Sequence, residues 1–87
     1  MKVTIQVTQE DIKNGQPTRC LKCPLALAAT RAFGHQIFVA RYTMFSMDVN
    51  GKVNFHGGKL PKEVTTWQWN FDNGIPVKPF DFEIEFD

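Results

Sequence analysis

Apolar and acidic side chains alternate without interruption over residues 80–87, and this stretch constrains the fold more than any other. Successive side chains of a β-strand point to opposite faces, so a strand here has one apolar and one acidic face. The apolar face carries Phe80, Phe82, Ile84 and Phe86. A sheet that needs cover on one face only is usually antiparallel or mixed, and helices supply the cover. The sequence therefore predicts an α+β fold.

The N-terminal residues predict a second strand of the same kind. Val3, Ile5 and Val7 alternate with polar residues, which indicates a strand that neighbours the last one in the sheet. Thr8 is a residue type that caps helices, and the pair at 14–15, Asn-Gly, is typical of a helix end. We expect a short helical segment between them.

Residues 18–34 predict the first long helix, because they contain four alanines, few β-branched residues and a glycine at the far end. Proline suits the first turn of a helix, so the helix begins either near Cys23 or at Arg19, with Pro24 among its early residues. At 100° per residue one helix face is apolar and consists mainly of small side chains. These are Leu21, Leu25, Ala28, Ala29 and Ala32, with Phe33 beside them.

The segment 35–42 predicts a strand, and the residues after it predict a hairpin whose turn contains Asn50-Gly51. A two-residue loop mixes polar and apolar residues on both faces. A three-residue loop at 49–51, with Gly51 in the left-handed conformation of a bulge, makes one face apolar throughout. The expected cross-strand pairs are Phe45 with Phe55, Met47 with Val53 and Asp48 with Lys52.

The segment 61–73 has two interpretations. As a helix it starts at Pro61, ends at 72–74 and aligns Val64, Trp67 and Phe71 in one stripe together with Leu60. As a strand it alternates β-branched and aromatic residues. We prefer the helix, because proline and glycine mark its ends.

The predicted order is then β-α-β-β-β-α-β. It describes one mainly antiparallel sheet of four to five strands with two helices covering one face. The 87 residues fit a single domain, 1–87, and a hydrophobic content of 43% argues against disorder.

Charge and hydropathy point to no membrane or nucleic-acid partner. The net charge is +1, the acidic face of the last strand repels phosphate, and no apolar run approaches ~20 residues. The N-terminus alternates and does not offer a signal-peptide core. We expect a soluble, intracellular protein, and the sequence does not indicate an oligomeric state.

One motif has chemical content, the Cys20-x2-Cys23 pair that precedes Pro24 at a helix start. A helix N-terminus with basic neighbours favours the thiolate, which suits redox exchange. A zinc site would need His35 and His56, at a spacing unlike that of structural zinc sites. The alternative without chemistry is that both cysteines are reduced and pack near the helix start as small hydrophobic residues. A thiol-redox or metal-binding protein therefore stays open as an alternative.

The remaining candidates for catalysis are weak. Ser46 is the only serine and falls in a predicted strand, and Gly57-Gly58-Lys59 lacks the other positions of a phosphate-binding loop. We predict no enzyme, no catalytic residue, no metal and no cofactor. A nucleic-acid or small-ligand binding module is a further alternative.

Trp69 and Lys59 are the candidate partner-binding residues. In the helical interpretation Trp69 lies about 140° from Val64 around the axis and points away from the core. Tryptophan is among the residue types that most often anchor interfaces.

The spacing of residues along nearly the whole chain resembles a group of short uncharacterised proteins encoded by bacteriophages and prophages. The resembling positions are Asp11-Ile12-x2-Gly15, Cys20-x2-Cys23-Pro24-Leu25-Ala26-Leu27-Ala28, Pro61-x2-Val64 and Phe71-Asp72-x-Gly74-x2-Val77-x-Pro79-Phe80-x-Phe82. The resemblance implies a phage accessory protein that acts in the bacterial cytoplasm, and it implies no particular activity. We expect it to inhibit or modulate a host or antiviral-defence protein.

Overall fold

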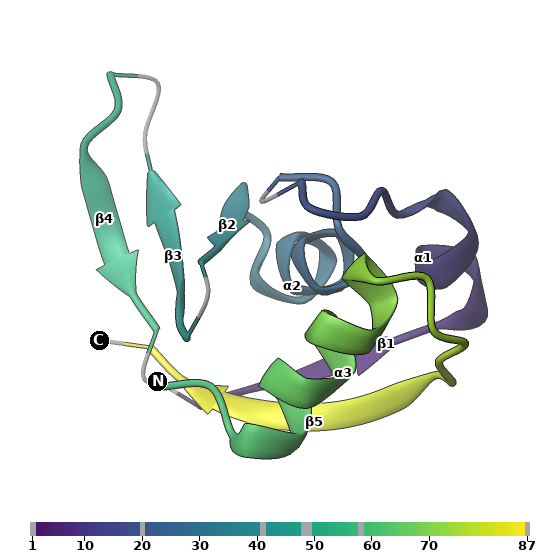
Figure 1. The fold of residues 1–87 in the computed structure, drawn as a ribbon. Coiled ribbons are helices and arrows are strands. Elements are labelled where there is room, and N and C mark those ends of the chain that lie inside the picture. The colour runs from purple at the N-terminus through teal and green to yellow at the C-terminus, as the bar shows by residue number, and fades with distance from the viewer. Residues whose placement is uncertain (1, 20, 41, 48–49, 58, 87) are drawn as a thin grey trace.

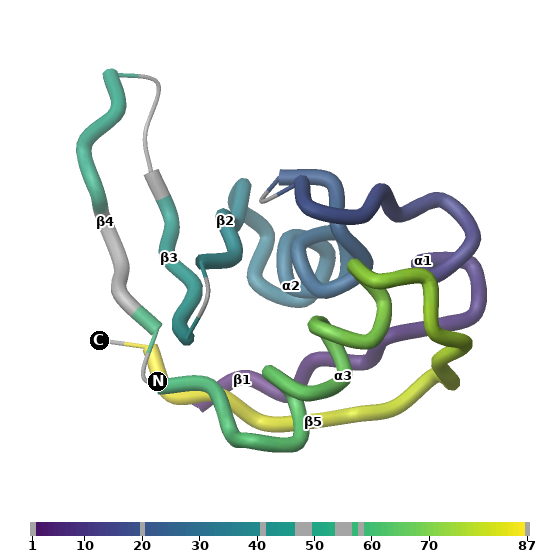
Figure 2. Tube along the Cα trace, in the orientation of Figure 1, coloured from purple at the N-terminus to yellow at the C-terminus, as the bar shows by residue number. Residues whose placement is uncertain are grey.

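The computed structural model describes residues 2–19, 21–40, 42–47, 50–57 and 59–86, with the backbone alone for 47 and 54–56 (Figure 2). The fold is α+β, as predicted. The elements in chain order are β1 (Lys2–Val7), α1 (Gln9–Asn14), α2 (Pro24–Phe33), β2 (Ile37–Val39), β3 (Met44–Met47), β4 (Val53–His56), α3 (Lys62–Asp72) and β5 (Phe80–Glu85).

The strands form two antiparallel sheets, so the expected single sheet is wrong (Figure 1). β1 pairs with β5, and β2, β3 and β4 form the second sheet in that order. The physical reason is the position of α2, which contacts both β1 and β2 and separates the two strands. An antiparallel bridge between Gly57 and Phe86 connects the two sheets at the ends of β4 and β5.

The β1–β5 sheet has the one-sided pattern that the sequence predicts. Ile5 lies opposite Phe82, and Thr4 lies opposite Glu83 on the other face. Ile5 is fully buried and Phe82 is partly buried, whereas Glu83 is exposed. β5 therefore buries its apolar face, and burial increases toward its end and the following Phe86, which is almost completely enclosed.

Helix α2 begins at Pro24, with Cys23 as its N-cap, so the longer helix from Arg19 is wrong. Of the residues that we expected on the buried face, Leu25, Ala28 and Ala29 lie there, and Ala26 joins them. Leu21 precedes the helix and is exposed, and Ala32, next to the last helical residue, is also exposed. The buried set is Leu25, Ala26, Ala28 and Ala29.

The hairpin between β3 and β4 has the predicted conformation at Gly51 but not the whole predicted register. Gly51 has φ of 81°, the left-handed conformation that glycine adopts without strain. Met47 lies opposite Val53, as expected. The expected pair of Asp48 with Lys52 is not tested, because residue 48 lies outside the described residues.

The pairing of Phe45 with Phe55 is wrong, because the structure places Ser46 opposite Phe55. A bulge between Ser46 and Met47 shifts the register by one residue. β2 explains the shift. Val39 pairs with Met44 and both are buried, so Phe45 lies on the opposite, partly exposed face, and its ring stacks on Phe38.

Segment 62–72 is a helix, which excludes the strand interpretation. Val64 and the preceding Leu60 are buried against the core. The ring centroid of Trp67 lies 5.0 Å from that of Phe80 on β5 and 6.0 Å from that of Phe71. The apolar stripe of α3 therefore packs toward the β1–β5 sheet, on the side where α2 also lies (Figure 1).

Candidate binding cleft

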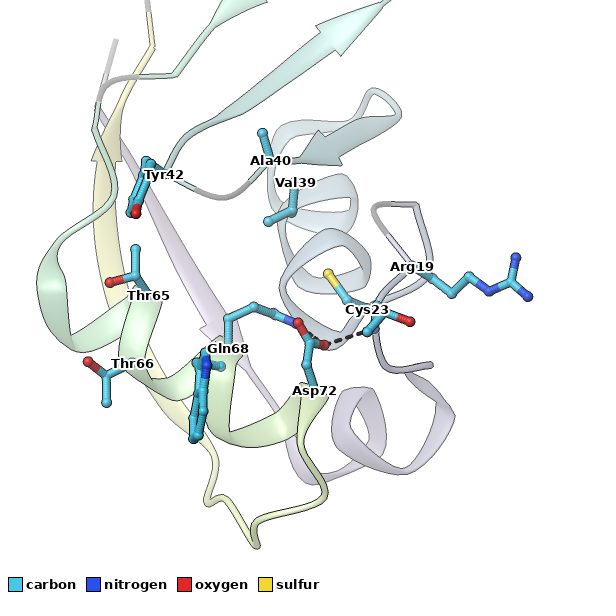
Figure 3. Close-up of a pocket in the computed structure, with 11 residues that line it drawn as sticks. Arg19, Cys23, Val39, Ala40, Tyr42, Thr65, Thr66, Gln68 and Asp72 are labelled. Carbon is cyan, nitrogen blue, oxygen red and sulfur yellow. Dashed lines mark hydrogen bonds between the residues drawn. The ribbon is translucent and has the colours of Figure 1, made fainter.

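A cleft of about 540 Å³ lies where α3, the start of α2 and the connection from β2 to β3 meet (Figure 3). We call it the α3 cleft. Cys23, Val39 and Ala40 line its apolar part, and Tyr42 and Trp69 also contribute to its lining. Its volume falls in the range of about 300–1,000 Å³ that is typical of ligand-binding pockets.

Helix α3 supplies the cleft with one face and the core with another. Thr65, Gln68, Trp69 and Asp72 recur at intervals of three and four residues, so they share a face of the helix. Val64, on the other side, is buried. The helical period of about 3.6 residues therefore places the apolar residues of α3 on one face and its cleft-lining residues on another.

A carboxylate fixes the polar end of the cleft. Asp72 Oδ1 accepts hydrogen bonds from the Thr18 backbone N–H at 2.9 Å and from Gln68 Nε2 at 2.8 Å (Figure 3). Thr18 has φ of 58°, a left-handed conformation that is rare for a β-branched residue. The hydrogen bond to Asp72 helps to hold this strained residue, and it ties the loop before α2 to the last turn of α3.

Gln68 contains a buried acceptor without a partner. Its Nε2 donates to Asp72, which orients the amide and leaves Oε1 on the other side. Among the described residues, Oε1 accepts no hydrogen bond although it is shielded from solvent. Native proteins pair most such atoms, so an unpaired one is a reason to look for a ligand.

Burial works against the reactivity of Cys23 that the sequence suggested. Burial raises the pKa of its thiol to about 11, although the Ala26 backbone N–H donates to Sγ and favours the thiolate. The thiol is therefore protonated at neutral pH, and it packs at the cleft wall as a small apolar group (Figure 3). Cys23 is free and buried, as the interpretation of packed cysteines expects, and its redox state stays a prediction.

The rest of the predicted thiol or metal site cannot be placed, since Cys20 lies outside the described residues. Within the part of the chain that the structure describes, no three His, Cys, Asp or Glu residues are grouped as a metal site would need. The cleft therefore contains a protonated thiol, a carboxylate and an amide, a set suited to binding.

Two aromatic side chains that line the cleft, Trp69 and Tyr42, are exposed to solvent. The exposed fraction is 58% for Trp69 and 55% for Tyr42. The predicted outward orientation of Trp69 is confirmed, and its binding role stays a prediction. Lys59 is exposed in the segment before α3 but does not line the cleft.

Sequence reasoning found Trp69 and missed the other cleft residues. If 62–72 is a helix, its period places Gln68 and Asp72 on the same face as Trp69, so sequence reasoning could have found them. Val39 and Tyr42 carry no comparable signal, because they reach the cleft only through the packing of the second sheet.

The structure is that of a small α+β protein with a candidate binding cleft. No protein-family model, curated protein or solved structure matches the chain at a significant level. Across the described residues, no helix has the length and apolar character needed to cross a membrane.

Proposed function

We propose that this protein is a non-enzymatic binding protein that recognises a protein partner through the α3 cleft, with Trp69 as the main anchor. The observation that carries the proposal is the exposure of Trp69 at a cleft of about 540 Å³. Tryptophan and tyrosine are enriched among residues that dominate binding energy, and pockets with an apolar lining and few polar groups are typical binding sites. Tyr42 adds a second exposed aromatic ring to the same surface.

The partner that fits the resemblance is a host or antiviral-defence protein in the bacterial cytoplasm. A chain of 87 residues can inhibit such a partner by occluding a functional surface, which needs no chemistry of its own. In this proposal the protein is a phage-encoded inhibitor or modulator. Lys59 belongs to the outer part of the contact surface, where charge mainly affects the association rate.

The α3 cleft also favours a second candidate, a small-ligand binding module. Its volume suits a small molecule, and the buried Gln68 Oε1 is the kind of polar atom that orients one. Native mass spectrometry of protein purified from its host distinguishes the two. A bound molecule that survives desalting supports the small-ligand function.

The main test is affinity purification from bacterial lysate with matched baits. Wild type, Trp69→Ala and Ile75→Ala are compared, because Ile75 is also an exposed apolar residue but does not line the cleft. We expect a protein that wild type and Ile75→Ala retain and that Trp69→Ala loses. The proposal is wrong if all three baits retain the same proteins in the same amounts.

A further inference from the structure

Several polar donors of the α3 cleft are already engaged, although the second N–H of Gln68 Nε2 has no partner among the described residues. The Thr18 backbone N–H and Gln68 Nε2 both donate to Asp72. The Thr18 hydroxyl donates to the Pro17 carbonyl at 2.7 Å, and the Thr65 hydroxyl donates to the Lys62 carbonyl at 2.9 Å. A ligand that brings acceptors, such as a carboxylate or a phosphate, would find few donors there.

Two acceptors in the same place have no hydrogen-bond partner among the described residues, although Gln68 Oε1 is shielded from solvent. Both hydrogen bonds to Asp72 end on Oδ1, and within the described residues none reaches Oδ2. Gln68 Oε1 is unpaired as well, so it has no hydrogen bond to lose when its side chain adjusts to a ligand. The cleft thus offers a carboxylate oxygen and an amide oxygen to a group that donates several hydrogen bonds.

The charge in the cleft has the sign that fits a cation. Asp72 contributes a carboxylate, while Arg19 is the basic residue among the described residues of the lining. Arg19 is exposed, and its guanidinium points away from the other labelled side chains (Figure 3). Among the described residues, Asp72 therefore has no salt bridge.

We propose that the α3 cleft takes an arginine side chain of the partner protein. The inference rests on the proposed function and specifies what the cleft recognises. The planar guanidinium has five N–H donors, which suits two separate acceptors, Asp72 Oδ2 and Gln68 Oε1. The same plane stacks on an indole ring, which Trp69 supplies, and the methylene stem lies along Val39 and Ala40.

Lysine matches this arrangement less well. Its ammonium is a compact and strongly hydrated charge, whereas the guanidinium is flat, weakly hydrated and able to stack. Acidic and phosphorylated side chains are disfavoured, because the Asp72 carboxylate repels them. The cleft therefore selects for the shape of the cation as well as for its charge.

The test uses four capped tripeptides, Ac-Gly-X-Gly-NH2, in which X is arginine, lysine, citrulline or leucine. Binding is followed by shifts of the Trp69 indole and Gln68 amide signals in ¹H–¹⁵N NMR spectra of the full chain. We expect the arginine peptide to bind at least about tenfold more tightly than the citrulline peptide, which keeps the shape and loses the charge. Equal binding of the leucine peptide, or no saturable shift with arginine, overturns the inference.

A variant locates the interaction. Asp72→Asn keeps an oxygen for the Thr18 N–H but removes the charge, and we expect it to abolish the preference for arginine over citrulline. Glu63→Gln is the matched control, because Glu63 is an exposed carboxylate on α3 that does not line the cleft. An unchanged preference in Asp72→Asn that melts like wild type also overturns the inference. If Asp72→Asn does not fold, the four peptides decide with wild type alone.

The two proposals fail in different ways. Retention of a partner that depends on Trp69, together with no preference for the arginine peptide, removes the arginine inference and leaves the binding function in place. A preference for arginine without any Trp69-dependent partner removes the protein-binding function instead.

Discussion

Arg31 on α2 holds Asp11 on α1 through two parallel hydrogen bonds, NH1 to Oδ1 and NH2 to Oδ2, both 2.8 Å long. The Asp11 side chain is 6% exposed, whereas that of Arg31 is 54% exposed. Arg31 NH2 also donates to the Gln6 carbonyl, so one side chain connects β1, α1 and α2. Arg31→Met leaves a buried carboxylate poorly paired and should lower the free energy of unfolding by about 1–3 kcal/mol. Urea denaturation at neutral pH measures it, with the exposed Lys13→Met as control.

The same pair predicts a pH dependence. The hydrogen bonds from Arg31 lower the pKa of Asp11 below its ordinary value of 3.8, with help from Thr8, although burial acts in the opposite direction. As the pH falls, the unfolded chain therefore takes up this proton first. The stabilisation is complete above the unfolded-state pKa and is lost as the pH falls through the folded-state pKa. The difference between wild type and Arg31→Met should shrink over that interval, and a constant difference would contradict the assignment.

The last strand predicts a graded response to truncation. Phe86 is buried and stacks on Phe33, with ring centroids 4.6 Å apart, so Phe86→Ala should cost about 3–5 kcal/mol. Phe82 is only partly buried, and Phe82→Ala should cost less than Phe86→Ala. Glu83 is exposed, and its 3.8 Å ion pair with Lys2 is a surface contact, so Glu83→Ala should cost under about 0.5 kcal/mol. Denaturant melts that rank Glu83→Ala with Phe86→Ala would refute this assignment of the faces.

Gly57 marks the place where the two sheets meet. Its N–H donates to the Met44 carbonyl at 2.7 Å, and a Cβ at this position would lie 2.6 Å from that oxygen and 3.1 Å from Ile84 Cδ1. Backbone cannot yield as a flexible side chain does, so Gly57→Ala should destabilise by about 1–3 kcal/mol. Gln36→Ala, at an exposed position, serves as control and should change stability by less than about 0.5 kcal/mol. Equal melting of the two variants would show that the close approach is absent in solution.

Local patterns in the sequence predicted the local elements well. The alternation at 80–87, the cap at Thr8, the proline at the start of α2 and the left-handed Gly51 each act over a few residues, and each is present. The Thr8 cap is a complete capping box, in which Asp11 returns a hydrogen bond to the Thr8 N–H.

The failures concern contacts between distant residues. The Arg31–Asp11 pair spans 20 residues, and the Thr18–Asp72 hydrogen bond spans 54. Neither periodicity nor capping signals encode such distances. The single predicted sheet failed for the same reason, because nothing local shows that α2 lies between β1 and β2. The cleft is assembled from segments that are distant in the sequence. Sequence patterns could therefore predict only the face that α3 contributes.

Cys23 should be unreactive in the folded protein. Because burial raises the pKa of this thiol to about 11 from the ordinary 9.0, iodoacetamide at neutral pH should label Cys23 slowly in native protein and quickly in urea. Peptide mapping by mass spectrometry follows Cys23 separately from the other cysteine. The sign of the linkage also predicts that stability falls as the pH rises from about 9 toward 11, because the unfolded chain loses this proton first. Rapid native labelling of Cys23 would restore the redox alternative.

The two tryptophans of α3 should behave differently, although they lie two residues apart. Trp67 packs between Phe71 and Phe80, and its Nε1 donates to the Lys78 carbonyl at 2.8 Å. Trp69 is 58% exposed at the α3 cleft. In single-tryptophan variants made by Trp67→Phe or Trp69→Phe, acrylamide should quench the fluorescence of Trp69 far more readily than that of Trp67.

Stability separates the two residues as well. Trp67→Ala removes ring packing and a hydrogen bond, so it should lower the free energy of unfolding by more than about 1 kcal/mol. Trp69→Ala should change it by less than about 0.5 kcal/mol, because an exposed side chain contributes little to folding. A loss of partner binding in Trp69→Ala then reports on the contact surface and not on the fold. Equal quenching of the two residues, or a large destabilisation by Trp69→Ala, would mean that Trp69 is packed in solution and is not free to anchor a partner.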